Sequence, residues 1–140
     1  MSVTENKALI RQFNEEAFNG KDIRARDRFL GPDFAINGQV VDPARSKRNV
    51  ADLFSAFPDF HRTMDDIIAE GDKVVARYTA RGTHHGEFMG IQATGKSVTF
   101  RWVTIYRIAD GKVAEEWPLF DALGLVQQLG GTALPGPQRG

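Results

Sequence analysis

The chain has 140 residues, no cysteine, and 18 basic and 18 acidic residues, so its formal net charge is zero. The missing cysteine excludes disulfides and cysteine-based metal or redox sites. The balanced charge gives no reason to expect nucleic acid or an anionic membrane as a partner.

Three helices are predicted in the first half of the chain, over residues 2–19, 22–30 and 42–57, with a short strand at 33–37. Ser2 and Glu5 have the spacing of a capping box, which is typical of a helix start. The third helix begins at Asp42-Pro43, where an N-cap aspartate is followed by a first-turn proline.

From residue 60 onward the pattern becomes that of strands, predicted at 60–70, 73–82, 98–108 and 113–120, before a helix at 122–129. Helices followed by antiparallel strands are the α+β pattern. We therefore expect a cone-shaped α+β barrel, with three N-terminal helices on a strongly curved antiparallel or mixed sheet and a short C-terminal helix. Its interior suits a small apolar ligand.

The domain is placed at residues 1–131, with residues 132–140 as a flexible tail rich in glycine and proline. No apolar stretch approaches the roughly 20 residues that span a bilayer, and the N-terminus lacks the apolar core of a signal peptide. The default expectation is a soluble cytoplasmic protein.

Three segments carry a family resemblance: the Phe57-Pro58-Asp59 break, the stretch from Glu70 to Gly90, and the ending from Trp117 to Gly130. Together they resemble the SnoaL-like polyketide cyclases of the nuclear transport factor two-like superfamily, over residues 5–130. The resemblance implies ring closure by intramolecular aldol condensation, without metal or cofactor, with Asp121 as the acid/base. It also implies a homodimer or homotetramer that forms through the open sheet face.

Asp121 has two interpretations from its position. It stands just before a helix, where an aspartate N-cap accepts backbone N–H groups. It also follows a strand rich in aromatic residues, which can deliver a carboxyl group to an apolar pocket for general acid/base work. The resemblance favours the catalytic interpretation. It also aligns Trp102 and Thr104 with a glutamine and a histidine of the family's cyclases, so the pocket wall is predicted to be more apolar here.

His84 and His85 lie in a glycine-flanked loop, and neighbours in extended chain face opposite sides, so at most one can face the pocket. We predict His84 as a second acid/base or oxyanion donor, against the alternative of a solvated loop pair. The histidines lack metal-ligand spacing, and no metal site is predicted.

The predicted substrate-binding residues are aromatic or polar side chains near the expected pocket: Trp102, Thr104, Tyr106, Asn37, Phe57, Met89 and Trp117. Asn37 fits an Asn-Gly turn equally well. The arginines at 24, 26 and 28 are predicted to form a solvated helix face.

Three other functions stay open. The first is a non-catalytic protein that binds a hydrophobic small molecule. The second is a steroid-isomerase-like reaction, which needs Tyr78 or Tyr106 and a second acid at one oxyanion. The third is a hydrolase with paired carboxylates, for which Asp65, Asp66 or Glu116 could supply the partner.

Overall fold

Residues 2–131, the part of the chain that the computed structural model describes, form helices around one six-stranded sheet of order β2-β1-β6-β5-β4-β3. The helices are α1 (Val3–Phe13), the π-helix η1 (Asn14–Asn19), α2 (Ala25–Phe29), α3 (Pro43–Ala56) and α4 (Ala122–Gln128). The strands are β1 (Leu30–Ile36), β2 (Gln39–Val40), β3 (His61–Glu70), β4 (Lys73–Thr83), β5 (Ser97–Ala109) and β6 (Lys112–Phe120). The tail predicted at residues 132–140 lies outside the described residues.

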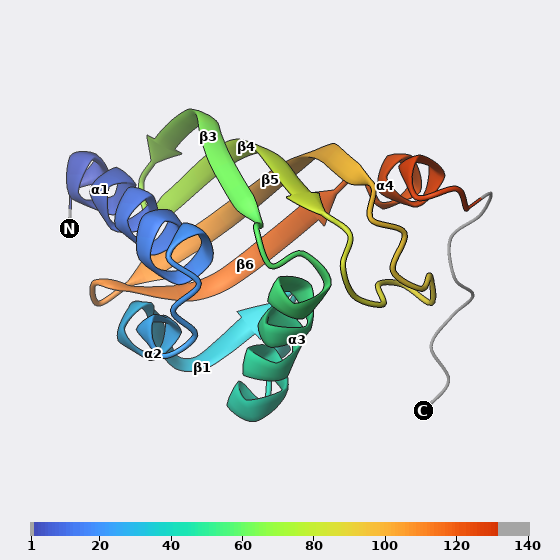
Figure 1. The fold of residues 1–140 in the computed structure, drawn as a ribbon. Helices are drawn as coiled ribbons and strands as arrows, with labels where there is room; N and C mark the ends of the chain where they lie inside the picture. The colour runs from blue at the N-terminus through green and yellow to red at the C-terminus, as the bar shows by residue number, and fades with distance from the viewer. Residues whose placement is uncertain (1, 132–140) are drawn as a thin grey trace.

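The sheet is curved, and α1, α2 and α3 lie on the same side of it, with α4 at one end (Figure 1). Strands β3 to β6 form an antiparallel meander, whereas β1 runs parallel to β6, so the sheet is mixed. This arrangement confirms the predicted α+β class, with three N-terminal helices on a curved sheet and a short helix at the end. No helix within residues 2–131 is long and apolar enough to cross a membrane.

The inner face of β5 confirms the period-two alternation that predicted it. Phe100, Thr104 and Tyr106 are buried, and Trp102 between them is half-buried. Apolar side chains of α1, η1 and β4 pack against this face and complete the core. The inner face of β5 is therefore the surface against which the core packs.

The first helix begins as predicted but ends differently. Ser2 and Glu5 form a capping box, with both reciprocal hydrogen bonds present. The segment Asn14–Asn19, predicted as ordinary helix, is a π-helix, which makes i to i+5 hydrogen bonds. Asp42 also differs from expectation, because its side chain makes no capping bond although Pro43 occupies the first turn of α3.

Candidate active site

A cavity of about 220 Å³ lies between α3 and the inner face of β1, β6 and β5. Most of its wall is apolar, and includes Phe18, Ile36, Leu53, Phe100, Trp102 and Phe120. Its polar lining consists of Arg26, Ser46, Asn49 and Glu116. Asn49 is exposed, so the cavity reaches the surface beside α3. An apolar hollow with a few converging polar groups is the usual form of a small-molecule site.

Glu116 is the one acid that lines this cavity within residues 2–131. It lies on β6 between Tyr106 of β5 and Ile36 of β1, and only 7% of its surface is exposed. Burial raises the pKa of its carboxyl group, and the nearby positive charges of Arg26 and Arg62 offset only part of that rise. A carboxyl with a raised pKa in an apolar cavity is suited both to take a proton and to give one back.

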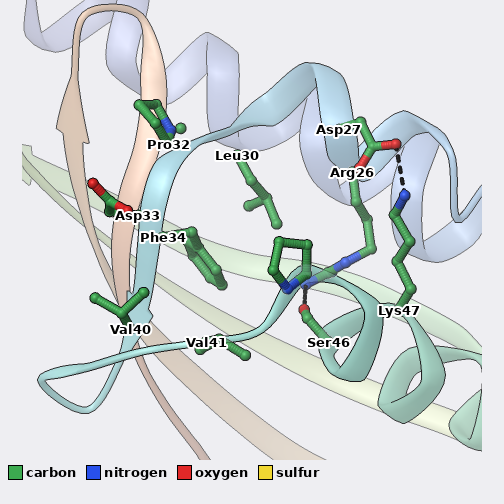
Figure 2. A pocket seen from close by; sticks show the side chains of 12 residues that line it. Arg26, Asp27, Leu30, Pro32, Asp33, Phe34, Val40, Val41, Ser46 and Lys47 are labelled. Atoms are coloured by element: carbon green, nitrogen blue, oxygen red, sulfur yellow. Dashed lines mark hydrogen bonds and ion pairs between the residues drawn. The ribbon is translucent and has the colours of Figure 1, made fainter.

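Arg26 extends from α2 into the wall of the cavity and is only 3% exposed. Figure 2 shows its guanidinium reaching α3, where Nη2 donates a hydrogen bond of 3.1 Å to Ser46 Oγ. Its Nε is buried without a hydrogen-bond partner among the described residues. The sequence prediction of a solvated Arg26 is therefore wrong, because α2 turns this side chain inward.

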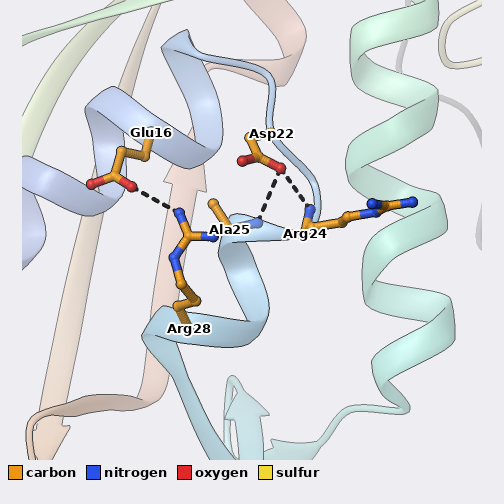
Figure 3. Close-up of polar contacts among 5 residues, drawn as sticks. All are labelled: Glu16, Asp22, Arg24, Ala25 and Arg28. Carbon is orange, nitrogen blue, oxygen red and sulfur yellow. Dashed lines mark hydrogen bonds and ion pairs between the residues drawn. The ribbon is translucent and has the colours of Figure 1, made fainter.

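Local hydrogen bonds and an ion pair hold α2, the helix that carries Arg26, in place (Figure 3). Asp22 Oδ1 accepts the backbone N–H groups of Arg24 and Ala25 at 3.1 and 3.2 Å, although Asp22 lies two residues before the N-cap. Arg28 forms an ion pair of 2.8 Å with Glu16 of η1. A helix of five residues is too short to be stable alone, so these contacts and core packing hold it.

Arg62 of β3 is clamped behind the cavity by the π-helix. Its Nε donates to Asn14 Oδ1 at 2.7 Å, and its backbone N–H donates to Asn19 Oδ1 at 2.7 Å. Both asparagines return a bond of 3.0 Å to its carbonyl oxygen. Its guanidinium carbon lies 3.7 Å from the ring centre of Phe18 and 3.8 Å from that of Tyr78. The five-residue spacing of the π-helix brings both asparagines to one strand residue.

Two hydrogen bonds between side chains support the floor of the cavity. The hydroxyl oxygens of Tyr78 and Tyr106 lie 2.7 Å apart, and burial raises the pKa of both. Trp102 Nε1 donates to Thr104 Oγ1 at 3.1 Å. Trp102 lines the cavity, and its contact with substrate stays a prediction, whereas Thr104 and Tyr106 are not among the lining residues. These two residues hold the wall rather than forming its surface.

Asp121 caps α4: its Oδ1 accepts the backbone N–H of Gly124 at 2.9 Å. The residue is exposed and is not part of the cavity lining. The N-cap interpretation is therefore correct for its local structure. Its catalytic role stays a prediction.

His84 is fully buried and His85 is exposed, which agrees with the expectation that the pair faces opposite sides. His84 Nδ1 accepts the backbone N–H of Thr94 at 3.2 Å, and its ring packs 5.6 Å from that of Phe57. His84 and Phe57 do not line the cavity. They hold the loop after β4 against the end of α3.

The remaining predicted contacts also lie away from the cavity lining. Asn37 occupies an exposed turn with a positive φ of 52°, as its alternative interpretation expects. Met89 lies on a separate hollow beside α3. Trp117 pairs with Ile105 on β5, next to Glu116 but on the opposite face of the strand. Within residues 2–131 no cluster of three or more acidic or histidine side chains is arranged to hold a metal ion.

The sequence analysis does not identify Arg26 or Arg62 as site residues. It names Glu116 as a possible partner acid but does not establish on which face of its strand Glu116 lies. The inward direction of Glu116 is set by a bulge in the β5–β6 hairpin. Arg107 pairs with Glu115 but Ile108 pairs with Val113, which leaves Ala114 as an extra residue. This bulge reverses which later residues of β6 face inward. Nothing in the local sequence distinguishes the two arginines from solvated ones.

A family model described as SnoaL-like polyketide cyclase matches residues 8–129. Two relatives are aklanonic acid methyl ester cyclases, DnrD of Streptomyces peucetius and DauD of Streptomyces sp. (strain C5). Each is 37% identical over 62 residues, which is 43% of this chain and 41% and 37% of the relatives. The match thus spans about two fifths of the length of these curated relatives.

Solved structures share the fold over nearly the whole chain. AclR of Streptomyces galilaeus, a candidate hydroxylase, is 34% identical with a TM-score of 0.83, over 92% of this chain and 98% of AclR. TsrD of Streptomyces laurentii is 32% identical with a TM-score of 0.83, over 93% and 98%. A candidate polyketide cyclase of Acidithiobacillus ferrooxidans is 29% identical with a TM-score of 0.81, over 95% and 100%.

Proposed function

The chain belongs to the SnoaL-like polyketide cyclase family, and from this premise we propose that it closes a ring in a hydrophobic small molecule by cofactor-independent acid/base chemistry. The observation that carries the proposal is Glu116, a buried acid with a raised pKa in an apolar cavity. The cyclase names of DnrD and DauD support the reaction type.

The reaction that fits is an intramolecular aldol addition. The Glu116 carboxylate removes a proton from a carbon next to a carbonyl group, which leaves an enolate. The enolate carbon attacks a second carbonyl carbon of the same molecule, a carbon–carbon bond forms, and the attacked oxygen becomes an alkoxide. Glu116, now protonated, returns the proton to that alkoxide, so one carboxyl group serves both steps. Arg26 lies on the same cavity and can stabilise the negative oxygen.

The test is Glu116→Gln, assayed with aklanonic acid methyl ester and simpler diketones that can close a ring. Glutamine keeps the size and hydrogen-bonding capacity of the side chain but cannot accept the proton. Turnover should fall by about 10²–10⁴-fold, the usual share of a general acid/base. Circular dichroism and the melting temperature check that the variant folds. Unchanged turnover in a folded variant would remove Glu116 from the mechanism.

A second candidate is a non-catalytic protein that binds a hydrophobic small molecule. This candidate is favoured because Asp121, the acid that the family resemblance makes catalytic, caps α4 and does not line the cavity. This function requires binding without conversion. A product search by mass spectrometry after long incubation with bound diketones separates the two candidates, since any cyclised product excludes a purely binding role.

We also propose that two copies pair through the outer face of the sheet. Apolar side chains gather there, with Leu119 76% and Ile68 61% exposed, and Ile105 lies between Val75 and Trp117. An apolar patch of this kind marks an interaction surface. Light scattering should give a dimer or tetramer for the native chain and a monomer for Leu119→Glu. A native monomer would contradict the proposal.

A further inference from the structure

The interior beside the cavity holds more positive than negative charge. Two arginines, Arg26 and Arg62, are 3% and 1% exposed, and Glu116 is the one buried acid within residues 2–131. Arginine stays protonated in proteins, and burial raises the pKa of Glu116, so this single carboxyl group can offset at most one of the two guanidinium charges. A buried cation without a compensating charge costs free energy, so at least one guanidinium lacks its counter-charge in the empty site.

The two arginines differ in how their groups are used. The guanidinium of Arg62 is packed between the rings of Phe18 and Tyr78, and its Nε bonds to Asn14. It does not line the cavity. Its Nη2 is buried without a hydrogen-bond partner among the described residues, as Arg26 Nε is. The Arg62 group, however, is packed between aromatic rings and lines neither of the hollows beside Arg26, so a ligand in those hollows does not reach it.

Arg26, in contrast, forms part of the wall between two hollows. One is the cavity with Glu116, and the other is a hollow of about 230 Å³ between α2, β1 and the start of α3, shown in Figure 2. Ser46 lines both hollows and is the one hydrogen-bond partner of the Arg26 side chain among the described residues. The buried Nε has no partner at all there. The guanidinium of Arg26 therefore has a hydrogen-bond donor, Nε, without a partner, and the residue lines both hollows.

The charges at the rim offset Arg26 only weakly, because Asp27 acts on it least among the charged groups nearby. Asp27 and Lys47 lie on the second hollow and pair with each other at 2.8 Å (Figure 2). Asp33, on the same hollow, is exposed and makes no ion pair within residues 2–131. The counter-charge for Arg26 is thus expected from the ligand, because a planar guanidinium binds an oxygen anion with two oxygens especially well.

We propose that the cavity takes a ligand bearing an ionised oxygen group, either a carboxylate or the enolate of a 1,3-dicarbonyl, which binds the guanidinium of Arg26 beside Ser46. This inference deepens the proposed function, because it names the substrate class of the same cavity. The apolar wall holds the body of the ligand, and Arg26 fixes which end lies beside Glu116. The aromatic lining, with Trp102 and Phe120, suits a flat ring system.

The test uses three flat bicyclic probes of similar size. They are 2-naphthoate, a carboxylate; 2-naphthamide, its neutral counterpart; and 2-acetylindane-1,3-dione, whose 1,3-dicarbonyl is ionised at neutral pH. Affinity is measured by calorimetry and by the fluorescence of Trp102 and Trp117. We expect the native chain to bind at least one anion about tenfold or more tightly than the amide, as befits a hydrogen-bonded charge in a buried site. The stronger of the two anions identifies the ionised group.

Three variants sharpen the result. Arg26→Met should remove the preference for the anions, whereas Arg48→Met, which removes an exposed cation of α3 that lines neither hollow, should leave it. Glu116→Gln should strengthen anion binding, because it removes the competing negative charge. This third variant and the native comparison keep the inference testable if Arg26→Met fails to fold.

The inference is overturned if the amide binds as tightly as both anions, if none of the probes binds, or if folded Arg26→Met keeps the preference. The proposed function fails separately. An anion preference in a protein that converts no substrate would support this inference together with the binding-protein alternative. Conversion of neutral diketones with no anion preference would support the cyclase and overturn this inference.

Discussion

Glu116 and Asp121 are two acids five residues apart near the end of one strand, and their surroundings differ sharply. Glu116 is enclosed in an apolar cavity, with two arginines nearby and a raised pKa. Asp121 is exposed, and its side chain accepts the backbone N–H of Gly124 in the first turn of α4. The difference teaches that burial and partners, rather than residue type or closeness to an aromatic strand, decide which carboxyl can move a proton.

Turnover should separate the two acids most strongly. Asp121→Asn keeps an N-cap side chain and should leave the rate of ring closure close to that of the native chain, whereas Glu116→Gln loses about 10²–10⁴-fold. The measurement is kcat for both variants on one diketone substrate. A loss in Asp121→Asn as large as that in Glu116→Gln would reverse the comparison and return Asp121 to the catalytic role that the family resemblance implies.

The clamp on Arg62 gives the next largest effect. Asn14→Ala leaves Arg62 Nε without its acceptor in a buried position, so the free energy of unfolding should fall by about 1–3 kcal/mol. Chemical denaturation measures this change, with Asn37→Gly as control in an exposed turn of positive φ. A loss no larger than in the control would show that the clamp does not hold Arg62.

The cap at Asp121 should contribute about 1 kcal/mol to stability and nothing to proton transfer. Asp121→Ala removes the acceptor for the Gly124 N–H. Thermal denaturation should show the loss, while Asp52→Ala, at an exposed site within α3, serves as the matched control. Equal melting temperatures for the two variants would contradict the capping role.

The ionisation of Glu116 should also change the free energy of unfolding with pH, by less than the effects above. Its pKa in the folded chain is raised above 4.5, its ordinary value, so the native state binds the proton more tightly than the unfolded chain. This contribution is fully present below about pH 4.5 and is lost as the pH rises through the raised pKa. The native chain should therefore lose stability relative to Glu116→Gln across that range. A constant difference between the two would contradict a raised pKa.

The fold follows from local sequence patterns, but the position of Glu116 in the site follows from an irregularity in β6. Alternation along β5 and the capping box at Ser2 identify elements that tertiary packing preserves. The facing of β6 depends on the unpaired Ala114, which turns Glu116 inward and Trp117 outward. A one-residue bulge reverses a face without leaving a clear mark in hydrophobic periodicity, so the outward facing of Trp117 does not follow from the sequence.

The arginines escape sequence reasoning for a different reason. An isolated charged residue is usually solvated, and nothing near Arg26 in the chain shows that Ser46 will face it. Burial of Arg62 depends on Asn14 and Asn19, which lie more than forty residues away. Long-range partners of this kind become visible only in three dimensions.

The π-helix also means that the number of residues between Asn14 and Asn19 cannot change without moving their side chains. Asn14, Phe18 and Asn19 reach Arg62 because the segment between them holds its particular number of residues. Removing one residue from a helix rotates the residues after it relative to those before it, so deleting the exposed Glu15 would swing Phe18 and Asn19 away from the strand. The segment should accept many replacements at Glu15 but no insertion or deletion, so an alignment gap here would mark a relative with a differently built interior.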